Sequence, residues 1–540
     1  MEVVNKPVKL GVRFLMRVPP GRRHRLLQAS SQYTPSMAAP ESYENWTRQD
    51  LIARLRRLER AGGTSASKSR AGRDVDFAAQ PRRKIALKFC YSGWEYGGLA
   101  FQEGHTVLPT VENVLFDALA RTRLVDPAKG FDGCGWERCG RTDRGVSSAG
   151  QVVSLWIRTT LDCPDGPSYL PPERDAVALS TRREAPQDAS ASDDDSDSLL
   201  DQTEPSSSTA HGTRKRPEFQ FVSMLNRVLP ITIRILAWSP VSSDFSARFA
   251  CRYRHYKYFF TSHGLDVERM RDGARRLLGE HDFRNLCKLD PAKQITSFKR
   301  KILEAEISEV DSAPSDRGGV PSEPLYVFDL AGTAFLYNQV RHIVAVLFMI
   351  GTGLEHPSVI TSLVNVDRSN PYPPFQEGEP APEIVDTKPV YQMADSLPLM
   401  LWDCVYDEKD VSWRVTSGDP AVEKDLLKSE NGPGNLIQQL GSAYGRSRIF
   451  TALNRQFLAA GQQYIPPPKS YLPIGGPGVD ALVPNAMLDI PLGGGTYRQT
   501  TKYVPLLQRD RLEHVDIVNE RWREGKGSRR AARQQVDGDE

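Results

Sequence analysis

The chain has 540 residues, of which 39% are hydrophobic and 25% are charged, a composition that excludes a wholly disordered protein. The 70 basic and 67 acidic residues nearly cancel, so the net charge of +3 neither indicates nor excludes a polyanionic partner. Seven scattered cysteines are an odd number, which argues against a disulfide framework and favours a reducing compartment.

The N-terminal residues 1–81 are expected to form a basic arm, one amphipathic helix and a linker. Between Glu2 and Glu41 the chain has Arg, Lys and Ser but no acid, which is faintly like an organelle transit peptide. We favour a disordered basic arm, because such a segment has little apolar surface to bury. Leucines at helical spacing predict a helix within 43–60, and a Ser- and Gly-rich linker follows at 61–74.

Residues 82–163 are expected to form the first half of the folded domain. The predicted elements are a half-buried strand at 84–91, a helix at 111–124, a Gly-rich loop at 130–145 and an apolar strand at 151–157. This order is typical of an α/β or α+β protein. Pro, Ser and an acidic run then predict a disordered insertion at 164–217.

Residues 218–408 are expected to continue the domain and to form its second half. Helices are predicted near 219–228, 266–278, 335–353 and 357–364, and strands near 231–238, 248–260, 302–310, 326–330 and 399–405. The similar content of the two halves suggests an internal duplication. The longest apolar stretch, Ile343 to Leu354, is shorter than the roughly 20 residues that a bilayer requires, so we expect no membrane span.

Residues 409–540 are expected to form a C-terminal extension with weak patterning. It includes predicted helices near 422–439 and 447–460, and it ends in a basic tail. Such basic runs, like Arg214-Lys215-Arg216, fit either a nuclear-import signal or an RNA-contacting arm.

The sharpest local motif is Cys139-Gly140-Arg141-Thr142-Asp143-Arg144-Gly145, which leads into the strand at 151–157. A carboxylate that lies between two guanidinium groups is held ionised and can act as a nucleophile or a base. Taken alone, however, Asp143 and its neighbours fit an ordinary turn better, because Asp and Gly are common turn residues.

A second motif places cationic and aromatic residues on the strand predicted at 248–260. Because side chains alternate along a strand, Arg252, Arg254, Tyr256 and Tyr258 share one face. Guanidinium groups can contact phosphates and a phenol ring can stack on an exposed base, so this face suits RNA. An aromatic core strand with a solvated basic face explains the pattern equally well.

A third motif, Phe335 to Val344, places Arg341 before an apolar helical run. Arg341 either lies on the surface or turns into a cleft, where a carboxylate has to neutralise it, and pairing with Asp143 would satisfy both. The neighbouring His342 is expected to be a packed or an exposed helix residue rather than a catalyst. His281 and Asp282 invite a catalytic interpretation, but we favour Asp282 as a helix cap.

Several enzyme classes lack support in the sequence. It contains no phosphate-binding Walker loop, no HExxH motif and no dinucleotide fingerprint, which removes support for phosphoryl transfer, zinc proteolysis and NAD chemistry. Cys134 and Cys139 are close together, but no second ligand pair stands at zinc-binding spacing, so we expect no metal.

Together the three motifs resemble those of the TruA family of tRNA pseudouridine synthases. The family loop G-R-T-D-x-G-V is matched by Gly140 to Val146, its tyrosine segment by Arg254 to Tyr258, and its F-L-Y-x-x-V-R segment by Phe335 to Arg341. The resemblance covers most of 82–310 and 325–406. Further likeness points to the eukaryotic branch that modifies uridines 38 and 39 of the anticodon stem-loop. Arg144 departs from the Lys that is common in the family.

The resemblance implies a TruA-like fold, with two similar sheet-plus-helix halves around a central cleft. It also implies isomerisation of uridine to pseudouridine without a cofactor or metal. Asp143 would be the catalytic nucleophile or a base, Tyr256 would stack on the uracil and could also move a proton, and Arg341 would hold Asp143 ionised. Arg141 would fill the gap left by the flipped nucleotide, and Arg144 and Arg254 would contact the RNA.

The resemblance further implies a tRNA partner and a homodimer, with no membrane and no small-molecule cofactor. We expect a location in the nucleus, the cytoplasm or both, with mitochondrial import left open by the N-terminal arm. Two alternatives remain at this point: the same chemistry on other tRNA positions or other RNAs, and a non-catalytic tRNA-binding protein on the same scaffold.

Overall fold

The computed structural model describes residues 75–102, 106–161, 169–170, 218–311, 324–417, 434–465 and 487–529. These residues belong to one compact unit, which begins at Val75. The predicted basic arm and its helix, nearly all of the acidic insertion at 164–217 and the end of the basic tail lie outside the described residues.

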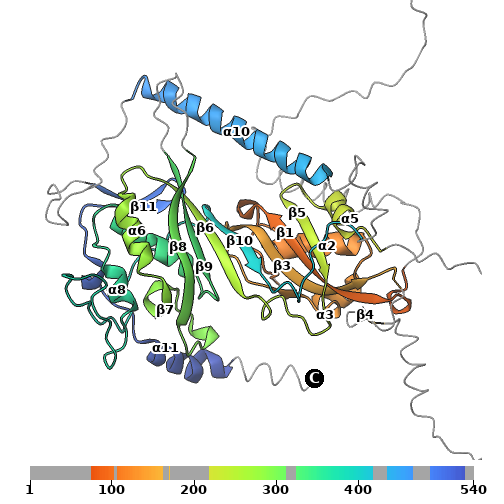
Figure 1. The fold of residues 1–540 in the computed structure, drawn as a ribbon, viewed down its shortest axis with the longest axis horizontal. Helices are drawn as coiled ribbons and strands as arrows, with labels where there is room; N and C mark the ends of the chain where they lie inside the picture. Colours follow the sequence, from red (N-terminus) through yellow and green to blue (C-terminus); the bar gives the residue numbers. More distant parts are fainter. Residues whose placement is uncertain are drawn as a thin grey trace, which may run out of the picture. The chain divides into compact units, whose positions relative to one another are not determined.

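A ten-stranded mixed sheet forms the centre of the described fold (Figure 1). Its strands lie in the order β4-β1-β3-β10-β6-β9-β8-β7, with β5 paired to β1 and β2 paired to β3. The strands are β1 (Arg82–Tyr91), β2 (Glu137–Arg138), β3 (Ser147–Arg158), β4 (Tyr169–Leu170), β5 (Ile233–Pro240), β6 (Tyr253–Thr261), β7 (Gly279–Asp282), β8 (Lys299–Asp311), β9 (Leu325–Gly332) and β10 (Leu399–Val405). The mixed α/β class predicted from the sequence is therefore confirmed.

The sheet has two groups of strands: β1 to β5 form one, and β6 to β10 form the other. The two groups meet where β3 and β10 pair in parallel. Ser147 of β3 is in register with Met400 and Ser148 with Leu401, and β10 pairs on its other side with β6 in antiparallel fashion. Both groups of strands thus share one continuous sheet. Since the segment before β3 carries Asp143, this junction brings the first motif close to the second half of the domain.

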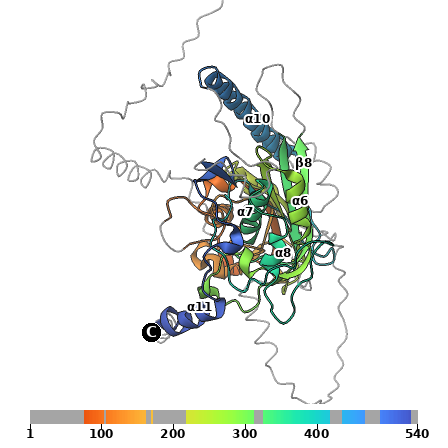
Figure 2. The ribbon, with the colours of Figure 1, turned by 90° about the vertical axis from the view of Figure 1, so that its left-hand side faces the viewer.

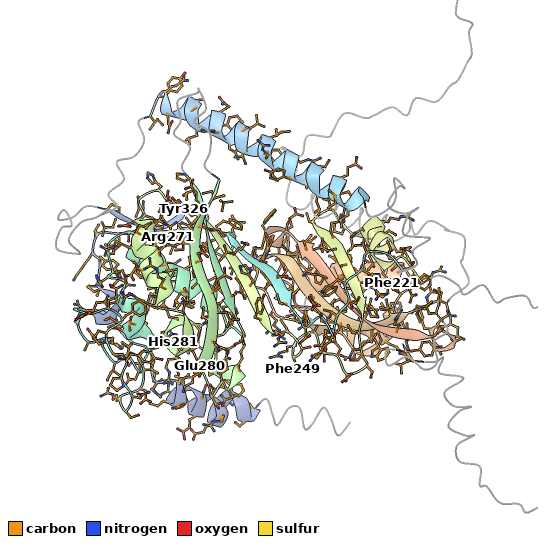
Figure 3. All side chains as sticks on the ribbon, viewed as in Figure 1. Phe221, Phe249, Arg271, Glu280, His281 and Tyr326 are labelled. Atoms are coloured by element: carbon orange, nitrogen blue, oxygen red, sulfur yellow. The ribbon has the colours of Figure 1, made fainter. Side chains whose placement is uncertain are left out.

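The first core lies against β1, β3 and β5. Ile85, Leu87 and Phe89 of β1 are fully buried on one face, as the period of two predicts, but Ala86 on the other face is fully buried as well, so this part of the strand is not half-exposed. The first three pack with α2 (Val111–Arg121) and α5 (Phe221–Val228). In α5, Phe221, which is labelled in Figure 3, meets Trp238 of β5 edge to face, with ring centroids 4.9 Å apart. A short helix, α3 (Gly130–Gly133), lies within the predicted Gly-rich loop.

The second core surrounds α7 (Gln339–Gly351), in which every residue except Arg341 is buried. It also includes residues of α6 (Val267–Arg275) and α8 (Val359–Val364), and α6 lies against β8 (Figure 2). The apolar stretch is thus a core helix, as predicted. Among the described residues, no helix is long and apolar enough to cross a membrane.

The C-terminal extension differs from its prediction in two ways. Among the described residues, one long helix, α10 (Gly434–Gln462), runs through Gly441 and Gly445, where two helices were predicted on either side of them. A glycine inside a helix costs only about 1 kcal/mol, so it weakens the helix without ending it. A hairpin of β11 (Leu488–Gly493) and β12 (Thr496–Thr500), which was not predicted, follows and contributes Leu488 and Ile490 to the second core. The last helix is α11 (Val515–Trp522).

Candidate active site

The loop that carries Asp143 is fixed by contacts on both sides of that residue. The hydroxyl of Thr142 hydrogen-bonds that of Tyr91 in β1 at 2.6 Å, and the amide of Leu99 donates to the carbonyl of Thr142 at 3.3 Å. The amide of Val146 donates to the Asp143 carbonyl at 3.1 Å, which closes a turn. Asp143 therefore stands at the tip of a turn that is anchored to β1 and β3.

Two glycines permit this close packing. A Cβ atom on Gly93 would lie 2.1 Å from the carbonyl oxygen of Val146, a distance that no side chain could tolerate. Gly145 has a φ of +87°, and a Cβ atom there would lie 2.6 Å from the hydroxyl of Ser396. The backbone can approach this closely only because glycine occupies both positions.

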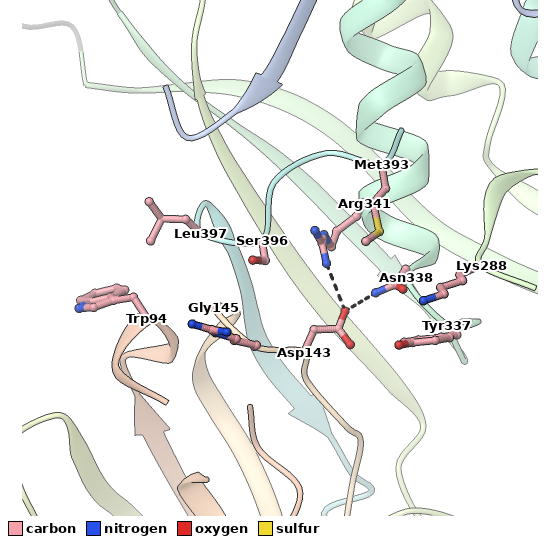
Figure 4. A pocket seen from close by; sticks show the side chains of 11 residues that line it. Trp94, Asp143, Gly145, Lys288, Tyr337, Asn338, Arg341, Met393, Ser396 and Leu397 are labelled. Carbon is pink, nitrogen blue, oxygen red and sulfur yellow. Dashed lines mark hydrogen bonds and ion pairs between the residues drawn. The ribbon is translucent and has the colours of Figure 1, made fainter. Parts of the chain in front are cut away.

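Arg341 and Asn338 reach Asp143 from the start of α7 (Figure 4). The Arg341 Nη1 atom lies 3.6 Å from the Asp143 Oδ2 atom, and Arg341 Nε donates to the carbonyl of Ala394 at 2.8 Å. The side-chain amide of Asn338 donates a hydrogen bond to the same Oδ2 atom. The structure thus brings Asp143 and Arg341 together across 198 positions of the chain (341 − 143 = 198).

The charge state of Asp143 reflects opposing influences. Burial raises the pKa of its carboxyl group, while the positive charges of Arg341, Lys293 and Lys288 lower it. The net direction is upward from the ordinary value. A carboxylate that is partly desolvated but still paired with cations is more nucleophilic and more basic than one in water, which suits it to chemistry on a substrate.

A pocket of about 510 Å³ opens at this carboxylate. Its lining combines one acid, several cations and a few apolar or aromatic side chains (Figure 4). The lining residues are Trp94, Asp143, Arg144, Gly145, Lys288, Tyr337, Asn338, Arg341, Met393, Ser396 and Leu397. Trp94 is 57% exposed, a large fraction for an indole ring, so its face is available to a ligand.

Two lysines gather around Tyr337 at one side of the pocket. The Nζ atom of Lys293 lies 3.8 Å and that of Lys288 5.3 Å from the centre of the Tyr337 ring. Both lysine side chains are exposed, and the amide of Lys288 donates to the carbonyl of Tyr337 at 2.8 Å. These cation–π contacts hold two positive charges near the pocket.

The three other predicted RNA-contacting arginines occupy different positions. Arg144 is exposed and lines the pocket, whereas Arg141 is exposed but is not part of the lining. Arg254 donates to the carbonyls of Thr333, Cys139 and Arg248 at 3.0, 3.2 and 2.8 Å. Arg254 therefore ties β6 to the start of the Asp143 loop.

Tyr256 lies in β6, in register with Leu401 of β10, which is itself in register with Ser148. Its ring meets Phe335 edge to face with centroids 5.0 Å apart, and it does not belong to the pocket lining. Burial raises the pKa of its hydroxyl, so the phenol is neutral near pH 7. A neutral phenol can stack or donate a hydrogen bond but cannot serve as a base.

The histidines near the motifs have other surroundings. His342 is buried beside the ammonium group of Lys388, with its Nε2 atom 3.2 Å from the Lys388 Nζ atom, and burial lowers its pKa to about 2. His281 contacts the hydroxyl of Tyr372 at 3.1 Å. Asp282 accepts from the amide of Arg284 at 3.0 Å, at the start of a short 3-10 helix. Within the described ranges, no cluster of His, Cys, Asp and Glu could hold a metal ion.

Comparison with known proteins connects this geometry to a family. A family model described as tRNA pseudouridine synthase matches residues 274–407. A tRNA pseudouridine(38/39) synthase of Bos taurus is 38% identical over 383 residues, which cover 69% of this chain and 67% of the relative. The chain belongs to the TruA family of tRNA pseudouridine synthases. The resemblance inferred from its three motifs is thereby confirmed.

Two further relatives of this TruA-family chain carry the same name. The tRNA pseudouridine(38/39) synthase of Homo sapiens is 38% identical over 359 residues, covering 65% of this chain and 63% of the relative. That of Saccharomyces cerevisiae is 34% identical over 400 residues, covering 70% and 74%. The chain thus spans about two thirds of the length of the mammalian relatives that it matches.

Several pocket residues of this TruA-family chain were not singled out from the sequence. Asn338 stands inside the third motif, but nothing in that motif shows that its side chain faces Asp143. Lys288 follows a segment that was examined for His281 and Asp282 only. Trp94 lies in a single 3-10 turn (Gly93–Glu95), and Met393 and Ser396 lie outside helices and strands; none stands in a periodic pattern, and the fold alone brings them to the pocket.

Proposed function

We propose that this protein isomerises uridine to pseudouridine at positions 38 and 39 of the tRNA anticodon stem-loop, with Asp143 as the catalytic nucleophile. The observation that carries the proposal is the Asp143 carboxylate at the pocket, 3.6 Å from Arg341 and hydrogen-bonded by Asn338. The position follows from the names of the relatives at 34–38% identity.

The reaction breaks the glycosidic bond of the uridine, rotates the base and joins the same ribose to a ring carbon. Asp143 attacks either C6 of the uracil or C2′ of the ribose, or acts as a base there, and in each case the ionised form is required. Arg341 supports that form by its positive charge, and its Nε bond to Ala394 fixes its position. No redox step is involved, because the product is an isomer of the substrate.

The surroundings of the pocket suit a flipped nucleotide. Trp94 and Tyr337 offer aromatic surfaces to bases, and Arg144, Lys288 and Lys293 offer positive charge to phosphates. Extrusion of the nucleotide from the stem-loop opposes binding by a few kcal/mol. Contacts of these cations with the RNA backbone offset that loss, and Arg141 occupies the gap in the stack. Arg254 also contacts the RNA in this proposal, while its hydrogen bond to the Cys139 carbonyl holds the start of the Asp143 loop.

Tyr256 stacks on the uracil. Because Tyr256 is not among the residues that line the pocket, the base has to move past that lining to reach the phenol ring. The support for Tyr256 is its place in β6, two strands from the start of β3, and its neutral phenol.

The proposal also includes the TruA-like arrangement of two similar halves, the domain boundaries given above, a homodimer, and a location in the nucleus, the cytoplasm or both.

The decisive experiment incubates the purified protein with unmodified tRNA that carries uridines at 38 and 39 and maps pseudouridine at single-nucleotide resolution. We expect product at 38, 39 or both with the wild type and none with Asp143→Ala, while tRNA affinity stays the same. Arg144→Ala is the comparison variant: it removes a pocket cation proposed to contact the RNA but leaves the carboxylate in place, so it should weaken tRNA binding and still form product at saturating tRNA.

Three outcomes would contradict parts of the proposal. Product at other positions would show the same chemistry on another substrate. Binding without product in the wild type would favour a non-catalytic tRNA-binding protein. Product from a folded Asp143→Ala protein would remove Asp143 from the reaction.

A further inference from the structure

The geometry points to Asn338 as a positioning residue that acts with Arg341 to fix the orientation of the Asp143 carboxylate, so that Oδ1 faces the substrate. This inference rests on the proposed function, and it adds a residue that the sequence motifs did not single out.

The backbone at Asn338 is unusual. Its φ of 56° and ψ of 17° place it in the left-handed region, which it shares with Arg123 and Gln294 alone among the described non-glycine residues. Asn tolerates this conformation better than most residues. Asn338 precedes the first residue of α7, where an Asn side chain commonly caps the helix by accepting a backbone hydrogen bond. Here it makes no such bond.

The side chain is used differently. Its amide donates to the Oδ2 atom of Asp143, 195 positions away in the chain. The left-handed turn is itself held firmly, because the amide of His342 donates to the Asn338 carbonyl at 3.1 Å and the amide of Leu336 donates to the Gln339 side chain at 2.8 Å. The donor is therefore supplied by a rigid segment of the backbone.

Asn338 and Arg341 both contact the same oxygen atom of the Asp143 carboxylate. Asn338 donates to Oδ2, and the guanidinium of Arg341 lies nearest to the same Oδ2 atom. Among the described residues, no hydrogen bond reaches Oδ1. The Asp143 side chain remains 32% exposed at the pocket, so Oδ1 is the oxygen left for the substrate. Arg341 stabilises the negative charge of the carboxylate, whereas the hydrogen bond from the neutral Asn338 amide fixes the orientation of the carboxylate.

Two substitutions separate this role from a purely conformational one. Asn338→Gly removes the amide and suits the left-handed backbone even better than Asn does. Asn338→Asp keeps the size and tolerates the same backbone, but places a second carboxylate against Asp143. If Asn338 serves only the turn, Asn338→Gly should behave as the wild type, whereas Asn338→Asp should still perturb Asp143 through its added charge.

We expect both variants to fold and to bind tRNA with unchanged affinity. The single-turnover rate of pseudouridine formation near pH 7 should fall roughly tenfold or more in Asn338→Gly, since a hydrogen bond to a charged group is lost. It should fall further in Asn338→Asp. The charged groups around Asp143 are Arg341 from α7, Lys288 and Lys293 beside Tyr337, and Arg144 from its own loop. These groups are the same in both variants. The lost hydrogen bond in Asn338→Gly and the added negative charge in Asn338→Asp should each raise the Asp143 pKa and move the acid limb of the pH–rate profile to higher pH.

A carboxyl ¹³C titration of aspartate-labelled protein, with Asp143→Asn to assign the signal, gives a second readout. The Asp143 pKa should rise in Asn338→Gly. If the wild type makes no pseudouridine, the proposed function fails while this titration still tests the inference. An Asn338→Gly protein with the wild-type rate, or with an unchanged Asp143 titration, would overturn the role of Asn338.

Discussion

At the scale of single residues, the Asp143 carboxyl group lies between an environment that favours protonation and cations that favour ionisation. Desolvation has the larger effect on its pKa, so its ionised form depends on Arg341 more than that of an exposed aspartate would. Arg341 has two functions here, since its Nη1 faces Asp143 while its Nε holds the carbonyl of Ala394.

This balance predicts the pH dependence. Because the reaction uses ionised Asp143 and its pKa is raised, the single-turnover rate should fall as the pH drops through a midpoint above the ordinary aspartate value of 3.8. Arg341→Met removes a charge that lowers this pKa, so the midpoint should move to higher pH, and Arg341→Lys should move it less. Rate profiles from acidic to neutral pH measure both shifts. An unchanged midpoint in Arg341→Met would show that Arg341 does not control ionisation.

At the scale of elements, the Asp143 loop depends on glycines whose positions are not equivalent. A Cβ atom on Gly93 would strike the backbone carbonyl of Val146, but one on Gly140 would meet no atom within 4 Å. Gly93→Ala should therefore displace the loop, lower the free energy of unfolding by about 1–3 kcal/mol and reduce activity strongly. Gly140→Ala should retain both. Thermal unfolding and single-turnover rates compare the pair, and equal behaviour would show that the loop is not held by Gly93.

The elements around the site show what the sequence could and could not predict. The strand alternation of β1 and the apolar run of α7 gave their positions to within a few residues, because burial on one face leaves a periodic signal. The helix was predicted from Phe335 but begins at Gln339, because Asn338 is left-handed. Asp143 and Arg341 belong to recognisable motifs, whereas Trp94 and Lys288 reach the pocket through contacts between distant segments, which leave no local pattern.

At the scale of the whole molecule, the C-terminal extension is part of the folded unit. The hydroxyl of Tyr503 and the amide of Leu506 both donate to Glu355, at 2.5 and 2.6 Å, just beyond the end of α7. The hydroxyl of Tyr258 donates to the carbonyl of Leu492 at 3.2 Å, and Gly493 approaches the same ring. The sequence did not predict this, because the apolar residues stand singly among Pro and Gly.

Substitutions of Leu506 and Leu458 test which parts of the C-terminal extension contribute to the stability of the folded unit. Leu506 is fully buried in the second core, whereas Leu458 on α10 is 55% exposed. Leu506→Ala should lower the free energy of unfolding by about 2–5 kcal/mol, because it removes transfer free energy and leaves a cavity. Leu458→Ala should change it by less than about 0.5 kcal/mol, since alanine also favours the helix. Denaturant unfolding measures both variants, and equal stability of the two would show that the extension folds separately.

Because Leu506 packs in the core that surrounds α7, its loss should also loosen the helix that carries Arg341 and so lower the activity.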